Sequence, residues 1–192
     1  MAQMTPEACA QMAKKINEYA EKKEWLTAIE SPGFRAFKGT PFKLDDVDYF
    51  RLFVRTWDAD IAGRVGFCLI QHAETFEKNC LKDVTQAEYF INNFLIALYF
   101  AGYLYKDFPK EPRIFRNLLY INYKLYQESG LVLFNACKKF GFKELESIVL
   151  GLRRTSFTKT RDLYLRYLAE YPDDHKARFR LQKIIKQGPQ NF

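Results

Sequence analysis

Asp58, Asp60 and Gly63 are the residues of this sequence whose types and spacing could bind an ion. The two carboxylates are two positions apart and the glycine follows three positions later. A loop at this point could offer oxygen ligands to Ca²⁺ and then turn sharply at the glycine. The alternative is structural: Asp58 and Asp60 cap a new helix, and Gly63 lies within or just before its first turn.

The surrounding segment, about residues 45–75, resembles a degenerate EF-hand. An apolar-periodic helix is expected before Asp58, and Val65 occupies the apolar eighth position of the loop. The resemblance implies a calcium loop, but Ala62 stands at the fifth ligand position and Leu69 stands where a closing glutamate would be. The remaining ligands are too few for tight binding, so we expect no bound metal. A calcium-responsive protein is kept as one alternative function.

A set of basic residues near the C-terminus could bind an anion or an acidic partner. The net charge is +7, and it is uneven: residues 1–100 carry twelve Lys and Arg against fourteen Asp and Glu, whereas residues 101–192 carry eighteen against nine. Lys176, Arg180 and Lys183 share one face of the last expected helix. The apolar stripe expected on the opposite face consists of Ala177, Leu181, Ile184 and Ile185. The candidate residues are Arg153, Arg154, Lys159, Arg161, Lys176, Arg180 and Lys183.

These basic residues allow a functional and a structural interpretation. Functionally, they could contact RNA phosphates or an acidic peptide, with Phe157 and Phe179 as the aromatic side chains able to stack on bases. Structurally, they keep a helix soluble, and Arg153 and Arg154 complement the C-terminus of a helix.

Catalytic chemistry has little support in the sequence. His72 and His175 are the two histidines, and the sequence has no nucleophile elbow, HExxH motif or Gly-rich phosphate loop. We therefore expect a non-enzyme without a cofactor. The four cysteines lack metal-ligand spacing and indicate buried thiols in a reducing, intracellular and cytoplasmic setting: Cys9, Cys68, Cys80 and Cys137.

The elements that position these residues are expected to be helices throughout. Thr85 to Glu88 has the form of a capping box, and the chain from Tyr89 to Tyr105 has no charged residue. This pattern predicts a buried apolar helix near residues 85–105 and not a membrane span, because the run is slightly short for a bilayer.

Short turns, expected at Ser129–Gly130, Gly141 and Tyr171–Asp173, divide the second half into regular helices. Alternate helix starts are 31 residues apart, which is typical of stacked helical hairpins. We predict an all-α fold of eight or nine helices, stacked as antiparallel αα-hairpins around the buried helix, in a single domain 1–192 with an alternative sub-division near 106–111. The helix starts are expected near Pro112, Ser129, Lys143, Lys159 and Asp174.

Residues 161–181 resemble a tetratricopeptide-type repeat: the second helix of one unit, its closing Pro172, and the first helix of the next unit. The resemblance implies a scaffold that binds peptides or RNA. Eighteen Phe and twelve Tyr exceed what one core of this size needs, and aromatic residues are enriched at protein interfaces. We therefore expect a non-catalytic adaptor or structural subunit whose partner is another protein, with an RNA-binding module as the alternative.

Overall fold

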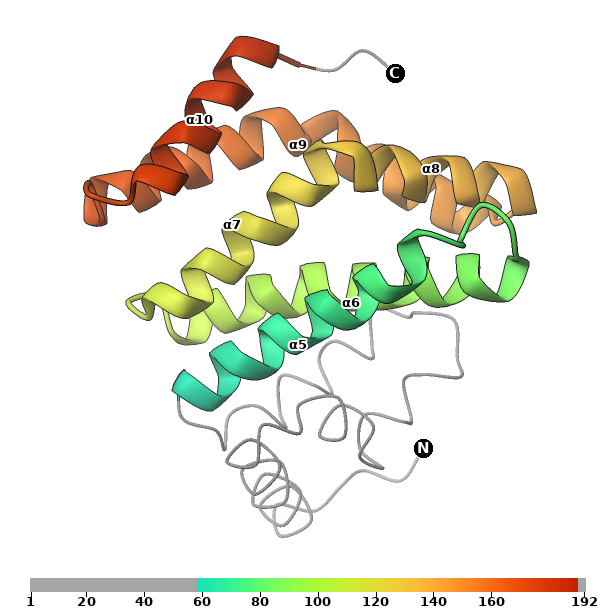
Figure 1. The fold of residues 1–192 in the computed structure, drawn as a ribbon, viewed down its shortest axis with the longest axis horizontal. Helices are drawn as coiled ribbons and strands as arrows, with labels where there is room; N and C mark the ends of the chain where they lie inside the picture. The colour runs from blue at the N-terminus through green and yellow to red at the C-terminus, as the bar shows by residue number, and fades with distance from the viewer. Residues whose placement is uncertain (1–58, 190–192) are drawn as a thin grey trace, which may run out of the picture. The chain divides into compact units, whose positions relative to one another are not determined.

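The structure is a computed structural model that describes residues 59–189, apart from a few side chains of the first helix. Within this range the chain forms six helices, α5 to α10, and no strand (Figure 1). The all-α prediction is therefore confirmed for the described part of the chain. The predicted count of eight or nine helices concerns the whole chain and stays a prediction.

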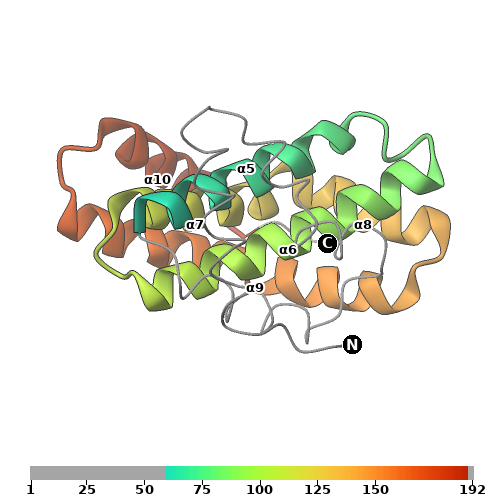
Figure 2. The ribbon, with the colours of Figure 1, turned by 90° about the horizontal axis from the view of Figure 1, so that it is seen from below.

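Helices α5 (Ala59–Glu77) and α6 (Val84–Asp107) lie side by side (Figures 1 and 2). The Asp83 side chain caps α6, because its Oδ1 accepts a hydrogen bond from the Gln86 N–H at 2.8 Å. The predicted helix is confirmed, but the predicted cap is wrong. Thr85 lies inside the first turn because Asp83, two residues earlier, already accepts from the free amides of the helix end.

Helix α6 is buried on nearly every side. Every residue from Phe90 to Leu98 is buried, including Asn92 and Asn93. Asn93 meets part of the cost of burying an amide by donating to the carbonyl of Tyr89, one turn earlier, at 2.7 Å. Among the described helices, none has the length and apolar character needed to cross a membrane.

Helix α7 (Pro112–Tyr126) begins at a proline, as predicted, where a missing N–H costs nothing. Its first half packs against α5: the Asn117 amide donates to the carbonyl of Gly63 at 2.6 Å. A Cβ at Gly63 would meet the Arg113 and Ile114 side chains at 3.1 to 3.4 Å. The glycine therefore allows α7 to approach the backbone of α5.

Helix α8 (Glu128–Phe140) starts one residue before the predicted position, and Gln127 alone forms the turn from α7. Ser129 and Gly130, predicted as the turn itself, are buried in the first turn of α8. A Cβ on Gly130 would lie 1.8 Å from the Leu125 carbonyl oxygen. Glycine is therefore required at position 130 because the Leu125 backbone lies so close, and not because the chain turns there.

Helix α9 (Lys143–Glu170) follows a left-handed glycine cap at Gly141, with φ of 72°. The predicted helix start at Lys159 is wrong, since α9 continues through it without a break. Ser156 and Thr155 turn their hydroxyls back onto the helix, donating to the carbonyls of Arg153 at 2.6 Å and Leu152 at 3.2 Å. These polar residues therefore do not compete for a new helix start. The helix starts at Pro112, Lys143 and His175 are still 31 and 32 residues apart, but without a start at Lys159 the last two belong to consecutive helices.

Helix α10 (His175–Gln187) follows the turn at Tyr171 to Asp174, and α9 packs against both α8 and α10. The described helices belong to two compact units, Met1–Leu118 and Leu119–Phe192, and the division falls inside α7. The predictions of a single domain and of stacked hairpins stay predictions. The predicted basic residues all belong to the second unit.

Candidate binding surface on helix α10

Helix α10 is fixed to the rest of its unit at both ends. At its start, Asp174 accepts from the Ala177 N–H at 3.0 Å through Oδ1 and from the Tyr167 hydroxyl at 2.9 Å through Oδ2. At its end, the Tyr126 hydroxyl donates to the Gly188 carbonyl at 2.7 Å. The surface of this helix is therefore presented on a rigid support.

The inner face of α10 packs with a narrow apolar stripe. Ala177, Leu181 and Ile184 are buried, and they recur at i, i+4 and i+7 as a helix face requires. The sequence interpretation added Ile185 to this stripe, but that side chain is 56% exposed. One residue beyond Ile184 turns the helix by about 100°, which moves Ile185 off the covered face.

Arg180 lies between the two faces and stacks on tyrosines. Its guanidinium is 5.4 Å from the ring centroid of Tyr120 and 5.3 Å from that of Tyr123. Both rings come from α7, and such contacts stabilise a guanidinium at the edge of a core. Burial raises the pKa of the nearby Tyr164 to about 12, although Arg180 acts in the opposite direction. Arg180 therefore supports the packing of α10 and is only partly available to a partner.

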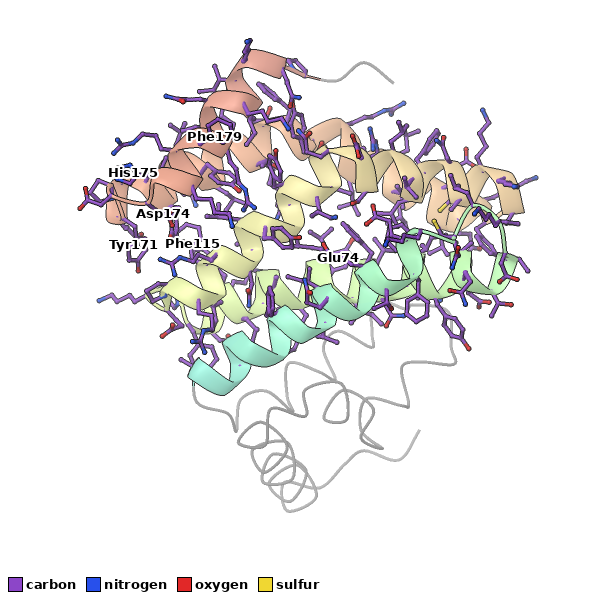
Figure 3. All side chains as sticks on the ribbon, viewed as in Figure 1. Glu74, Phe115, Tyr171, Asp174, His175 and Phe179 are labelled. Atoms are coloured by element: carbon purple, nitrogen blue, oxygen red, sulfur yellow. The ribbon has the colours of Figure 1, made fainter. Side chains whose placement is uncertain are left out.

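The outer face of α10 combines an aromatic ring with lysines. Phe179 is 69% exposed, the most exposed large apolar side chain among the described residues. Lys176, Lys183 and Lys186 are exposed at i−3, i+4 and i+7 from Phe179, so all three lie on its side of the helix. Figure 3 shows Phe179 on α10, with Tyr171 and Asp174 at the preceding turn. We call Phe179, Lys176, Lys183 and Lys186 the α10 outer face.

Sequence reasoning identified part of this surface. Lys176 and Lys183 were candidates for binding, and Phe179 was a candidate for stacking. Lys186 was missed, although its spacing of seven residues from Phe179 could have identified it. Arg180, predicted to share a helix face with Lys176 and Lys183, turns its guanidinium toward α7, where it stacks on Tyr120 and Tyr123.

The candidates on α9 do not form one surface. Arg153 is only 2% exposed, and burial lowers the pKa of its guanidinium. Its Nη1 would lie 2.7 Å from a Cβ at Gly130, so it abuts the start of α8. Arg154 and Lys159 are exposed. The expectation that Arg153 and Arg154 lie at a helix C-terminus is wrong, because both are in the middle of α9.

Arg161 has partners within its own helix. Its Nη2 lies 2.8 Å from the Asp162 carboxylate, and its guanidinium lies 5.7 Å from the centroid of the Phe157 ring. The pair is half-exposed and contributes little to stability. It nevertheless leaves Arg161 partly neutralised, which weakens its contribution to binding an anion.

The candidate ion loop lies partly outside the described residues. Asp58 is not described, and neither is the side chain of Asp60. The backbone of Asp60 and Gly63 lies in the first turns of α5, and Gly63 is buried. The backbone from residue 59 to residue 69 is therefore helical.

Other groups able to ligate or react are scattered. Cys80 and Cys137 are buried free thiols, and burial raises the pKa of both, that of Cys137 to about 12. His175 is exposed at the start of α10, whereas Cys9 and the side chains of Cys68 and His72 lie outside the described set. In the described part of the chain, no three His, Cys, Asp or Glu side chains gather as metal ligands would.

The fold and this surface define an all-α protein with a basic, partly aromatic helix at one end of the chain. No protein-family model, curated protein or solved structure matches the chain. The resemblances to an EF-hand and to a tetratricopeptide-type repeat therefore stay predictions.

Proposed function

We propose that this protein is a non-catalytic adaptor or structural subunit that works by binding another protein. The observation that carries the proposal is Phe179, which is 69% exposed on a helix held at both ends. Full burial of such a side chain against a partner is worth about 2 kcal/mol. Aromatic residues at the centre of a contact supply much of its binding energy.

Other exposed apolar side chains of the second unit support the same function. A single exposed leucine is ordinary in a soluble protein, so these residues add weight only together with Phe179. They are distributed over three helices, which we propose act as a scaffold of helical hairpins, α8 with α9 and α9 with α10. They are Leu131, Ile148, Leu165 and Ile185.

The RNA-binding alternative has less support. Of its candidate residues, Arg153 is buried, Arg161 pairs with Asp162, and Arg180 stacks on two tyrosines. Arginine is the residue best suited to phosphate recognition, and these three arginines have other roles here. The calcium alternative has less support again, because Asp60 and Gly63 lie in a helix.

The test compares the native protein in an extract of its own cells with the purified full chain at the same concentration. Size-exclusion chromatography followed by immunodetection should place the native protein in a complex clearly larger than the purified chain. Elution of both at the mass of one chain would overturn the proposal. Elution of both at the same larger mass would indicate self-association, and would also overturn it.

A further inference from the structure

We propose that the α10 outer face docks an acidic, amphipathic segment of a partner protein, with Phe179 inserted among the apolar side chains of that segment. This inference rests on the proposed function and assigns its binding site. The two features that the surface offers are a large exposed ring and three lysines around it, Lys176, Lys183 and Lys186.

Charge complementarity selects the kind of partner. Helix α10 carries five Lys and Arg and no Asp or Glu, and residues 119–192 carry fourteen basic against seven acidic residues. This imbalance accounts for the whole net charge of +7. Such a field attracts acidic proteins and orients their approach. A second copy of this chain would bring lysines against lysines, so the same face does not form a symmetric dimer.

The arginines of α10 do not belong to this face. Arg178 donates from Nη2 to the Pro172 carbonyl, and Arg180 stacks on the tyrosines of α7. The cations around Phe179 are therefore all lysines, which act as point charges without the planar fork that matches phosphate groups. A surface for single-stranded RNA would present several rings for successive bases, and this face presents one. A carboxylate-rich protein segment fits these features better.

Phe179 and the three lysines around it are arranged like the apolar centre and charged rim of a protein–protein interface. The ring supplies the buried area, and the lysines bury their aliphatic stems around it while their ammonium groups meet carboxylates. The complementary segment is an amphipathic helix with leucines along one stripe and glutamates beside them. Because α10 is held by its caps and by Tyr126, little ordering of this surface is needed on binding.

The experiment measures binding of the full chain to a synthetic, fluorescently labelled helical peptide of about four turns, with leucines on one stripe and glutamates beside it. Fluorescence anisotropy gives the dissociation constant. Two comparison peptides carry Gln for every Glu, or Ser for every Leu. We expect the acidic amphipathic peptide to bind at least about tenfold more tightly than either, and its affinity to fall as salt is raised.

Variants of the chain locate the site. Phe179→Ala and the double change Lys176→Glu with Lys183→Glu should each weaken binding of the acidic peptide by about tenfold or more. The matched controls are Phe67→Ala on α5 and Lys143→Glu at the start of α9, both exposed and outside the proposed site, which should bind as the unchanged chain does. Far-UV circular dichroism and melting temperature verify that every variant is folded. A variant that does not fold is replaced by Phe179→Ser or by Lys183→Glu alone.

Several outcomes overturn the inference. These are equal binding of the acidic and Gln peptides, no binding of the acidic peptide, or unchanged binding by the folded α10 variants. Tighter binding to oligouridine or to phosphatidylserine vesicles, lost on Phe179→Ala, would assign the face to RNA or to a membrane surface instead. If the native complex forms but survives these substitutions, only this site falls; if no native complex forms, the proposed function falls.

Discussion

At the scale of single residues, Gly130 shows how closely the backbone is packed at the start of α8. Any larger residue would place its Cβ 1.8 Å from the Leu125 carbonyl oxygen and 2.7 Å from Nη1 of Arg153. The neighbour is backbone, which cannot move aside as a flexible side chain can. Gly130 therefore sets how near α7 and α8 approach each other.

We predict that Gly130→Ala lowers the free energy of unfolding by about 3 kcal/mol, because the start of α8 must shift to accept the methyl group. The measurement is equilibrium unfolding in urea, followed by circular dichroism. The control is Gly151→Ala, in the exposed interior of α9, where a Cβ meets nothing within 4 Å. That change should stabilise the protein by up to about 1 kcal/mol. Equal changes in the free energy of unfolding for Gly130→Ala and Gly151→Ala would contradict the close approach of the Leu125 backbone to Gly130.

Tyr164 makes stability sensitive to alkaline pH. Burial raises its pKa from 10.0 to about 12, so between these values the unfolded chain releases the phenol proton while the folded chain retains it. The free energy of unfolding therefore falls as pH rises from about 10 to about 12, by about 3 kcal/mol in total from this group. Below pH 10 this contribution is complete and constant.

We predict that Tyr164→Phe reduces this alkaline loss of stability. The substitution keeps the ring, which packs edge-on against Tyr123 with centroids 6.3 Å apart. Urea unfolding at pH 8 and pH 11 should show a smaller difference for the variant than for the unchanged protein. Cys137, whose pKa is also raised by burial, causes an alkaline loss in both proteins. If the free energy of unfolding fell by the same amount between pH 8 and pH 11 in Tyr164→Phe and in the unchanged protein, the assignment to Tyr164 would be wrong.

At the scale of elements, the caps decide where helices begin, and the start of α6 distinguishes two candidate caps. The sequence pattern favours Thr85 with Glu88, whereas the structure uses Asp83, whose carboxylate accepts from the Gln86 N–H. Both residues could accept such a bond, so local pattern alone does not choose between them. Helix α6 begins at Val84 because Asp83, the residue immediately before it, caps the helix.

We predict that Asp83→Ala lowers the free energy of unfolding by about 1 kcal/mol, through loss of the cap, and that Thr85→Ala changes it by less than about 0.5 kcal/mol. Thr85 is exposed within the first turn, where alanine is a good helix former. Thermal unfolding of both variants under one condition measures the difference. A larger loss for Thr85→Ala would support the cap expected from sequence.

Helix α9 is a second case in which local pattern misleads, because it predicts a helix start where the structure has none. The start is predicted at Lys159, but the hydroxyls of Thr155 and Ser156 bond to carbonyls in the preceding turn, and the helix continues. Thr160 goes further and donates to the carbonyl of Asn122 in α7 at 3.2 Å. A contact so distant in sequence stabilises the middle of α9 and is not visible in local spacing.

At the scale of the whole molecule, α7 belongs to both compact units. Its first residues contact α5 through Asn117, and its last residues contact α9 and the end of α10 through Asn122 and Tyr126. Each unit contains about two turns of α7. If either unit unfolded, its two turns of α7 would lose their packing, and the other two turns would remain as a short helix. So short a helix is not stable by itself.

We therefore predict that the two units unfold together. Hydrogen exchange followed by mass spectrometry, at increasing urea, should show peptides from α6 and α9 losing protection at the same denaturant concentration. Gly130→Ala, which lies in the second unit, should shift both peptides equally. A shift confined to α9 would show that the units unfold independently.

The sequence by itself determined the helical class, the buried helix near residues 85–105 and the start of α10 near Asp174. These depend on interactions within a few residues: apolar spacing, an absence of charge, and a side chain close to free amides. Gly141 as a helix end belongs to the same group, because its left-handed conformation is a local matter.

The tertiary structure decided which of the basic residues reach the surface. Arg153 and Lys183 look alike in the sequence, but the start of α8 covers the first and nothing described covers the second. Arg180 lies against Tyr120 and Tyr123, which are far from it along the chain. Helical spacing says which residues share a face, whereas the neighbours that cover a face come from distant segments. Spacing in the sequence therefore identifies Lys176, Lys183 and Phe179 as candidates, and only the packed helices separate them from Arg153 and Arg180.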